Sequence, residues 1–220
     1  MGIEASSERE ELDSGAKYKE TEPQPEIIVI CGPMFCGKSD ELIRRVRRLP
    51  YEGLKVQAFT PKLDNRRGGD TINSEDGAIF PATSVAASIE ILALVAHDTH
   101  VVAIDEAQFF DSDLPGVCNT LASQGKRVIV AGLDKNFRGE PFGPMGELKH
   151  EADHVDTLHA FCAICRRPAS RTQRIKIIEG ERIPARYDDP IILVGATEAY
   201  EARCREHHEV PGRPEGIGTT

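Results

Sequence analysis

The sequence predicts an α/β fold, in which a parallel sheet core precedes a small metal-binding domain near the C-terminus. Three observations support this prediction. Apolar runs alternate with segments of helical periodicity along much of the chain, a glycine-rich motif follows the first of these runs, and two close-spaced pairs of Cys and His residues lie in the last part of the chain. Strands that alternate with helices are typical of a parallel sheet with helices on both faces.

The chain begins with a segment, residues 1–25, that is rich in Glu, Ser, Lys and Pro and almost lacks large apolar side chains. This composition predicts a disordered leader, and a solvated leader is favoured over a tag or a regulatory tail. At the other end, Pro and Gly recur over residues 211–220, which predicts a flexible tail.

A phosphate-binding motif, G-x-x-x-x-G-K-[ST], follows the apolar run 27–31, which reads as a buried strand. Its two glycines, Gly32 and Gly37, allow the backbone to bend so that its N–H groups converge on phosphate oxygens. Lys38 supplies a positive charge for the β- and γ-phosphates, and the hydroxyl of Ser39 can bind Mg²⁺. The full motif is Gly32, Pro33, Met34, Phe35, Cys36, Gly37, Lys38 and Ser39.

A helix is predicted over 40–46, directly after the motif. Unpaired N–H groups and the dipole favour anions at a helix N-terminus, so this context favours a phosphate site over a chance glycine turn. The arginines that follow are interpreted as a solvated helix end near the C-terminal dipole. They are Arg44, Arg45, Arg47 and Arg48.

The rest of the core continues the alternation. Further strands are predicted over residues 55–60, 79–82, 100–104 and 127–133, and further helices over 89–96 and 114–123. Connections in parallel sheets are right-handed, and ligands collect at the carboxyl ends of the strands. One cleft at that edge is therefore expected to hold the polar residues that follow these strands.

Two carboxylates, Asp105 and Glu106, end the apolar strand 100–104. In nucleotide hydrolases and kinases, an acid at this place binds Mg²⁺ through water, a role that we assign to Asp105. Glu106 is then left to act as a general base or to position a water molecule. An Asp-Glu pair alone is a weak signal, but it becomes strong downstream of a phosphate-binding motif.

Two turn-rich segments follow strands of the predicted core. Segment 62–70 contains Asp64 and Arg66, which could face a metal–phosphate site, although surface charges are the favoured interpretation of each alone. Segment 134–145 contains Phe137 and Phe142. These rings either pack onto the core or form a lid that stacks on a planar ligand, and the sequence does not favour one over the other.

The cysteine pattern predicts a structural zinc site with three thiolates and one imidazole, formed by Cys162, Cys165, Cys204 and His207. A redox dithiol or three unrelated buried cysteines are the alternatives. A redox Cys-x-x-Cys usually lies at the start of a helix. Here Arg166-Arg167-Pro168 follows the pair, which argues against a redox dithiol. The spacing favours His207 over His208, which is expected to be exposed. Strands are predicted at 171–177 and 190–195, between the two pairs.

Composition limits the class of partner. The formal net charge is −9 at pH 7, and no basic stripe of the kind that binds DNA or RNA is evident. The chain shows neither a charged-then-apolar leader nor a long apolar span. We therefore expect a cytoplasmic protein and no membrane partner. Among the remaining cysteines, Cys31 is expected in the core.

Taken together, the chain resembles the zinc-containing thymidine kinases over about residues 26–211. The motifs that carry the resemblance are Gly-Pro-Met-Phe-Cys-Gly-Lys-Ser, Ile-Asp-Glu-Ala-Gln-Phe-Phe, Gly-Leu-Asp-x-x-Phe-Arg-Gly-x-Pro-Phe and the two metal-binding pairs. The segments Tyr-Asp-Asp-Pro-Ile and Val-Gly-Ala-x-Glu-x-Tyr-Glu-Ala-Arg-Cys look like the bacterial branch. Each motif is moderately specific, and their order along the chain is very specific.

The resemblance implies a recombinase-like nucleotide-binding core at 26–158 and a zinc domain with a lasso-like loop at 159–210. It implies transfer of the γ-phosphoryl group of ATP to the 5′-hydroxyl of thymidine, with deoxyuridine as the substrate hardest to exclude, in nucleotide salvage for DNA synthesis. It also implies a homotetramer that is inhibited by thymidine triphosphate.

The resemblance further assigns individual residues. Glu106 is the catalytic base, and Ser39 and Asp105 serve Mg²⁺. Beyond the glycine-rich motif, the ATP contacts are Asp64, Arg66, Asp105 and Gln108. The thymidine pocket is formed by Met34, Leu133, Phe137, Phe142 and Tyr200, with main-chain contacts from Ile191, Ile192, Leu193, Val194 and Gly195.

The chain departs from the family pattern at three places. Cys36 stands where Ser or Ala is more frequent, Asn136 stands where Asp is common, and His207 replaces a Cys as the last zinc ligand. Two other functions compete with the kinase. One is a motor or recombinase ATPase, which would need a nucleic-acid surface, and the other is a zinc-ribbon binding module, which would leave the phosphate-binding motif unexplained.

Overall fold

The computed structural model describes residues 23–62, 70–192 and 199–214. Its largest element is a six-stranded sheet in the order β5-β2-β6-β7-β1-β8, and every pair of neighbours is parallel. The strands are β1 (Glu26–Gly32), β2 (Val56–Pro61), β5 (Thr83–Val85), β6 (Val101–Ile104), β7 (Arg127–Leu133) and β8 (His154–Thr157). The predicted α/β fold is confirmed.

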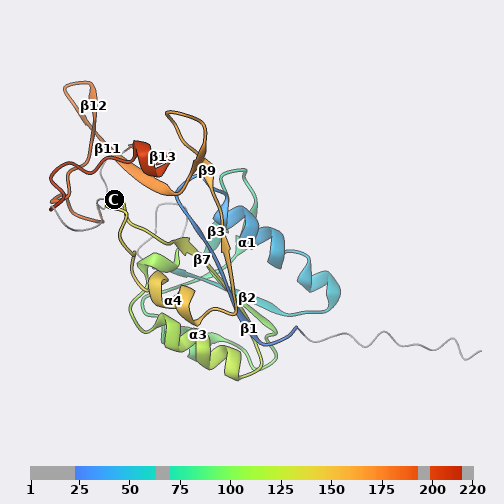
Figure 1. Cartoon of the computed structure of the whole chain (residues 1–220). Coiled ribbons are helices and arrows are strands. Elements are labelled where there is room, and N and C mark those ends of the chain that lie inside the picture. Colours follow the sequence, from blue (N-terminus) through green and yellow to red (C-terminus); the bar gives the residue numbers. More distant parts are fainter. Residues whose placement is uncertain (1–22, 63–69, 193–198, 215–220) are drawn as a thin grey trace, which may run out of the picture.

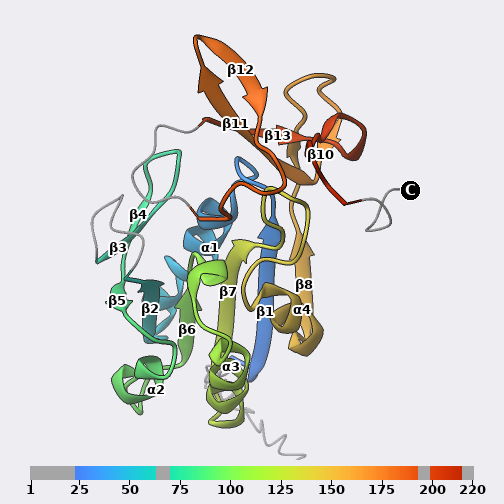
Figure 2. The same ribbon diagram turned by 90° about the vertical axis from the view of Figure 1, so that its left-hand side faces the viewer.

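Helices cover both faces of this sheet. The helices are α1 (Lys38–Val46), α2 (Glu90–Leu94), α3 (Leu114–Ser123) and α4 (Met145–Glu151). Figure 2 shows α3 and α4 in front of the strands and α1 behind them. Alternate side chains of each strand serve the two layers, since Ile30 packs in one cluster with Leu42 of α1, and Val29 packs in another with Leu114 of α3.

Two short helices and one hairpin complete the core region. They are η1 (Leu49–Glu52), η3 (Ala107–Phe109) and the hairpin of β3 (Thr71–Asn73) and β4 (Ile79–Pro81). A further short helix, η4 (Arg205–His207), lies near the C-terminus. The predicted core cysteine, Cys31, is fully buried. Arg44 and Arg45 both bind Glu41 on α1 and lie in its last turn, which agrees with a solvated helix end.

A second, antiparallel region lies over the carboxyl ends of the parallel strands (Figures 1 and 2). In it, β11 pairs with β12 on one side and β13 on the other, and β9 pairs with β10. These strands are β9 (Ala160–Phe161), β10 (Pro168–Ala169), β11 (Arg171–Ile178), β12 (Glu181–Pro184) and β13 (Ala199–Arg203). This position brings residues from the last quarter of the chain next to the glycine-rich motif.

Two predicted elements differ from the structure. The helix predicted over 89–96 is shorter, Glu90–Leu94. The strand predicted over 190–195 is wrong where it is described, because residues 190–192 form no strand and the chain bends at Ile191. Pro190 has no N–H to donate to a ladder, and its carbonyl accepts a hydrogen bond from the side chain of Arg174. Residues 193–195 lie outside the described residues.

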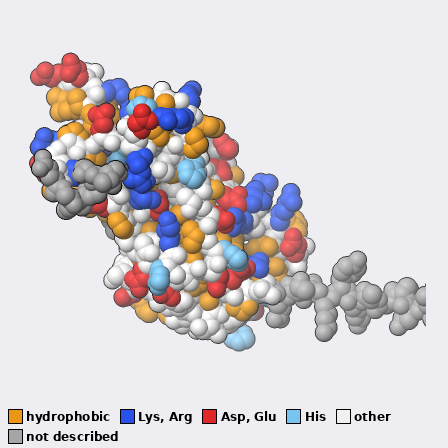
Figure 3. Space-filling view, viewed as in Figure 1, with side chains coloured by type: hydrophobic (Ala, Val, Ile, Leu, Met, Phe, Trp, Pro, Cys, Tyr) orange, Lys and Arg blue, Asp and Glu red, His pale blue; other side chains and the backbone are white. Residues whose placement is uncertain are grey.

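The surface in Figure 3 shows acidic and basic side chains interspersed on the face in view. Apolar side chains gather below the tip of the β11–β12 hairpin, where Ile177 and Ile178 are about half exposed. Among the described residues, we find no helix with the length and apolar character needed to span a bilayer.

The loop after β7 is anchored by a buried carboxylate. Asp134 is 6% exposed, binds Lys135, and lies 3.4 Å from Nζ of Lys149 on α4. Burial alone would raise the pKa of the Asp134 carboxyl, but the two lysines outweigh burial and hold this pKa below its usual range. Farther along the loop, the side-chain oxygen of Asn136 accepts hydrogen bonds from the N–H groups of Arg138 and Glu140. The amide of Asn136 therefore stabilises this turn at a position where Asp is common in the family that the chain resembles.

We expect Asp134→Asn to lower the free energy of unfolding by about 1–3 kcal/mol, because both lysines lose the charge that they face. The ionised carboxylate stabilises the fold at pH values above the ordinary pKa of Asp. This contribution is lost as the pH falls through the lowered pKa of the folded state, so wild type and variant should converge in acid. Urea unfolding at neutral and acidic pH measures both effects.

Asp98→Asn is the matched control, because Asp98 binds Lys55 in an exposed pair at 2.7 Å. Exposed ion pairs contribute little to stability, so this variant should unfold almost like the wild type. If the two variants lost the same free energy of unfolding, burial of the Asp134 carboxylate would not make its ion pairs more stabilising than an exposed pair.

Candidate active site

The glycine-rich motif forms the loop between β1 and α1, and its two glycines are required by the geometry. Gly32 has φ of 150°, and a Cβ there would lie 2.4 Å from the carbonyl oxygen of Leu158. Gly37 has φ of 78° and is the N-cap of α1. Both are conformations that side chains rarely adopt. The loop therefore folds as the sequence predicts, with a helix N-terminus directly behind it.

The acid pair meets this loop at the end of β6. The hydroxyl of Ser39 donates a hydrogen bond of 2.8 Å to Oδ2 of Asp105, which is 4% exposed. Lys38, the neighbour of Ser39, donates from Nζ to the carbonyl of Pro33 at 2.7 Å. A hydroxyl next to a carboxylate supplies the oxygen ligands that Mg²⁺ prefers, so these two side chains fit a magnesium site.

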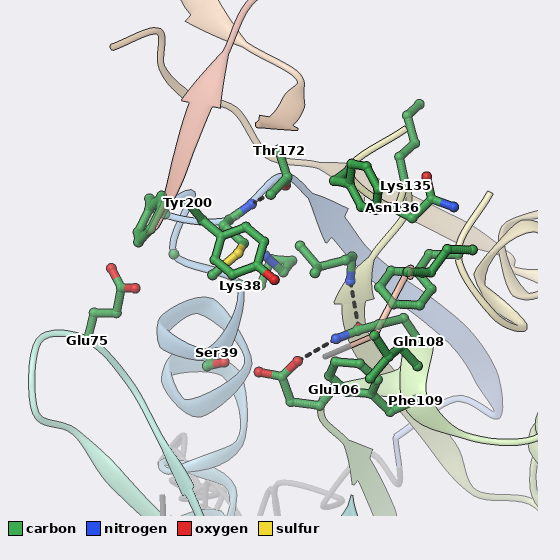
Figure 4. Close-up of a pocket in the computed structure, with 18 of the residues that line it drawn as sticks. Lys38, Ser39, Glu75, Glu106, Gln108, Phe109, Lys135, Asn136, Thr172 and Tyr200 are labelled. Carbon is green, nitrogen blue, oxygen red and sulfur yellow. Dashed lines mark hydrogen bonds between the residues drawn. The ribbon is translucent and has the colours of Figure 1, made fainter. Parts of the chain in front are cut away.

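Glu106 has an unusual backbone conformation, with φ of 53°. Its N–H donates to Oδ1 of Asp105 at 2.9 Å, and its Oε2 accepts a hydrogen bond of 2.5 Å from Nε2 of Gln108. Non-glycine residues in this region are uncommon and are concentrated at functional sites. Figure 4 shows the Glu106 side chain facing the same space as Lys38 and Tyr200.

That space is a cavity of about 230 Å³ between the loop, η3, the segment after β7 and the antiparallel region. It is lined by Met34, Phe35, Gly37, Lys38, Ser39, Asp40, Glu75, Glu106, Gln108, Phe109, Leu133, Lys135, Asn136, Phe137, Phe142, Thr172, Ile191, Ile192 and Tyr200. The loop contributes charged and hydroxyl groups, aromatic and aliphatic side chains form much of the rest, and Lys135, Asn136 and Thr172 add polar groups there.

The two rings of segment 134–145 both line the cavity. Phe137 is 4% exposed, and its ring centroid lies 5.2 Å from the guanidinium carbon of Arg174 and 5.7 Å from that of Arg138. Phe142 packs edge-on against Phe109, with ring centroids 5.5 Å apart. These rings are therefore held in place and also form a wall.

Several lining residues were missed by the sequence analysis. Thr172 is the clearest, because its hydroxyl accepts a hydrogen bond of 3.0 Å from the N–H of Met34 across the cavity rim. Its position on β11 carries no local motif that would have marked it. The other lining residues not predicted are Glu75, Phe109, Lys135, Asn136 and Asp40.

Five predicted site residues lie outside the described residues and are not placed here. They are Asp64, Arg66, Leu193, Val194 and Gly195. The other predicted members of the apolar wall, which are Met34, Leu133, Ile191, Ile192 and Tyr200, all line the cavity.

The four predicted metal ligands come together at the base of the antiparallel region. Their ligand atoms all lie within 4.8 Å of one another, and the Sγ atoms of Cys165 and Cys204 are 3.8 Å apart. Two thiolates at about 2.3 Å from one tetrahedral zinc are separated by about 3.8 Å, so the residues fit zinc. Burial opposes ionisation of Cys162, but nearby backbone N–H groups lower the pKa of its thiol to about 5, which favours the ligating thiolate.

The prediction that His208 is exposed is wrong. Its Nε2 donates a hydrogen bond of 2.8 Å to the carbonyl of Phe137, and its ring packs against Gly139. The side chain is partly buried, and burial lowers the pKa of its imidazole. The two adjacent histidines therefore point to different places, because His207 faces the cysteines and His208 faces the segment after β7.

The chain matches the model of a known protein family. The family model described as "Thymidine kinase" matches residues 25–208, which is most of the chain. The matched region contains the glycine-rich loop, the acid pair, the cavity walls and the Cys-His cluster.

Proposed function

We propose that this chain, which belongs to the thymidine kinase family, transfers the γ-phosphoryl group of ATP to the 5′-hydroxyl of thymidine and so forms thymidine monophosphate. The observation that carries the proposal is one cavity in which the glycine-rich loop and Glu106 lie across from several aromatic side chains. We propose deoxyuridine as a second substrate and pyrimidine deoxynucleotide salvage as the role of the reaction.

The loop end of the cavity is proposed to bind the ATP phosphates. Phosphoryl transfer depends mainly on alignment and on neutralisation of charge, and little on covalent chemistry by the protein. Lys38 and the N–H groups of the loop supply positive charge, and Ser39 and Asp105 would hold Mg²⁺, which would add positive charge next to the phosphates. Asp64 and Arg66 are proposed to join this site from the family motif alone.

Glu106 is proposed to be the general base. Its carboxylate follows the magnesium ligand Asp105 directly and faces the cavity, so it can accept a hydrogen bond from the 5′-hydroxyl of the nucleoside. The carboxylate takes the hydroxyl proton as the new O–P bond forms, and the bond to the leaving nucleoside diphosphate breaks.

The apolar end is proposed to bind the thymidine base. Phe137, Phe142 and Tyr200 offer ring faces and edges to a planar pyrimidine, while Met34 and Leu133 close the sides. Main-chain groups of residues 191–195 are proposed to bind the polar edge of the base, of which only 191–192 are described. This division explains why one cavity contains both charged and aromatic walls.

Structural zinc is proposed for the Cys-His cluster. Bound zinc would supply no reactive group, and its effect would be to hold β9 and the end of β13 together. Because Tyr200 lies on β13, this clamp would fix one wall of the nucleoside pocket. We also propose the division into a core at 26–158 and a zinc domain at 159–210, a homotetramer, inhibition by thymidine triphosphate and a cytoplasmic location.

A nucleoside panel tests the proposal. With ATP and Mg²⁺, thymidine should give its monophosphate fastest, and deoxyuridine should react with kcat/KM lower by about 10- to 200-fold at most, since it lacks one methyl group. Purine nucleosides should not react. ATP hydrolysis that depends on DNA and not on a nucleoside would instead support a motor ATPase, and no turnover with any nucleoside would contradict the proposal.

A further inference from the structure

Gln108 lies two residues after Glu106, on η3, and is 2% exposed. Its Nε2 donates a hydrogen bond of 2.5 Å to Oε2 of Glu106, and its Oε1 accepts one of 2.8 Å from the N–H of Leu133. Figure 4 shows the two bonds as dashed lines on either side of one amide. One side chain therefore connects the proposed base with a residue of the nucleoside wall.

The orientation of this amide is determined by its partners. A backbone N–H can only donate, so the N–H of Leu133 requires the oxygen of the Gln108 amide. The amide nitrogen must then face Glu106, where a carboxylate oxygen accepts. A flipped amide would place two donors together on one side and two acceptors together on the other.

Two glycines allow neighbouring backbone to lie close to Gln108. A Cβ at Gly132 would lie 2.8 Å from Oε1 of Gln108 and 2.7 Å from Sδ of Met145. Gly143, with φ of 51°, approaches from the opposite segment, and a Cβ there would lie 2.2 Å from the main-chain oxygen of Gln108. The residue is enclosed on its side-chain and main-chain sides by positions that carry no side chain.

We propose that Gln108 is a positioning residue that holds the carboxylate of Glu106 in its reactive place and ties that place to the nucleoside wall at Leu133. The proposal rests on the proposed function of Glu106 as base. It differs from the assignment of Gln108 to ATP that the family resemblance implies, because both ends of the amide are engaged away from the loop. A displacement of about 1 Å in a reacting group can reduce a rate by about 100-fold, so a rigid support matters.

Two substitutions separate the parts of this role. Gln108→Glu keeps an oxygen for the N–H of Leu133 and places a carboxylate against Glu106. Gln108→Met keeps the length and removes both hydrogen bonds. We expect each variant to lower kcat by about 10- to 100-fold, with KM for ATP and the dissociation constant of ATP, measured by titration without nucleoside, nearly unchanged.

Gln57→Met is the matched control. The Gln57 amide likewise uses both of its ends, since it accepts from the N–H of Ala96 at 2.7 Å and donates to the carbonyl of Leu94 at 3.1 Å. These contacts are at the α2 end of the structure, outside the cavity lining. This variant should lose thermal stability and keep its kcat.

A double-mutant cycle distinguishes positioning from general damage. In the Glu106→Gln background, Gln108→Met should reduce the residual kcat by no more than about two-fold, because its effect passes through Glu106. Independent, multiplying losses would overturn the proposal, as would wild-type kcat in either folded Gln108 variant. If Gln108→Met does not fold, the same cycle is measured with Gln108→Glu, and its result decides whether the proposal stands.

The nucleoside panel keeps the two proposals distinguishable. If the wild type phosphorylates another nucleoside and not thymidine, the proposed substrate is wrong, and the same variants are measured with the nucleoside that reacts. If thymidine reacts and the cycle is additive, only the role of Gln108 fails.

Discussion

Glu106→Gln is expected to lower kcat for thymidine by about 100- to 10,000-fold, the usual contribution of a positioned general base. The amide keeps nearly the same shape and still fits between Asp105 and Gln108, but it has no charge with which to take the proton of the 5′-hydroxyl. The phosphate site is formed by other residues, so ATP should bind as tightly as before. Steady-state kinetics and ATP titration measure the two quantities separately.

Glu147→Gln is the control for this change, because Glu147 is exposed on α4 and does not line the cavity. Its kcat should equal that of the wild type. If Glu106→Gln turns over at a near-normal rate, Glu106 is not the base, and proton removal must be assigned to another group. If the Glu106→Gln variant also binds ATP more weakly, Glu106 contributes to the phosphate site.

Cys162→Ser is expected to have the second large effect, through loss of the metal. Structural zinc sites in small domains bind with about 10–16 kcal/mol of free energy that is coupled to folding. Without the fourth ligand, the link between β9 and the end of β13 is lost, and the wall that carries Thr172 and Tyr200 loosens. We expect the variant to contain less than one zinc ion per chain and to have a lower melting temperature. Its KM for thymidine should rise by a larger factor than the factor by which its kcat falls.

Cys118→Ser provides the comparison, since Cys118 is equally buried but lies on α3, away from the cluster. It should cost stability and leave zinc content and KM unchanged. Metal analysis of purified wild-type protein is the direct check. Protein without zinc, or a chelator that removes zinc and leaves the KM for thymidine unaltered, would contradict the proposed clamp.

Much of the core could be predicted because its signals are local. The strand β7 and the helix α3 have the bounds that periodicity predicts, Arg127–Leu133 and Leu114–Ser123. The phosphate-binding motif and the Asp-Glu pair could be expected at one place, because parallel strands present their carboxyl ends at one edge. The four predicted metal ligands were chosen by their spacing, and their ligand atoms lie together.

Predictions failed where the outcome depended on a distant partner. The segment 190–192 is apolar like a strand, yet it bends, because Arg174 takes the carbonyl of Pro190. His208 is polar and next to a metal ligand, yet it is partly buried, because Phe137 offers a carbonyl there. Neither partner is near in sequence, so no local pattern contains this information.

The sequence by itself determined the fold class, the glycine-rich loop, the acid pair after β6 and the Cys-His cluster, since each is marked by a local pattern of residues. Only the tertiary structure decided which walls close the cavity and which groups orient its reactive side chains. The N–H of Met34 meets the hydroxyl of Thr172 across 138 residues, and the amide of Gln108 reaches Leu133 across 25. The first contact follows from how the antiparallel region packs over the parallel sheet, and the second joins the segments at the ends of the neighbouring strands β6 and β7. Packing of this kind depends on side chains from the whole chain at once.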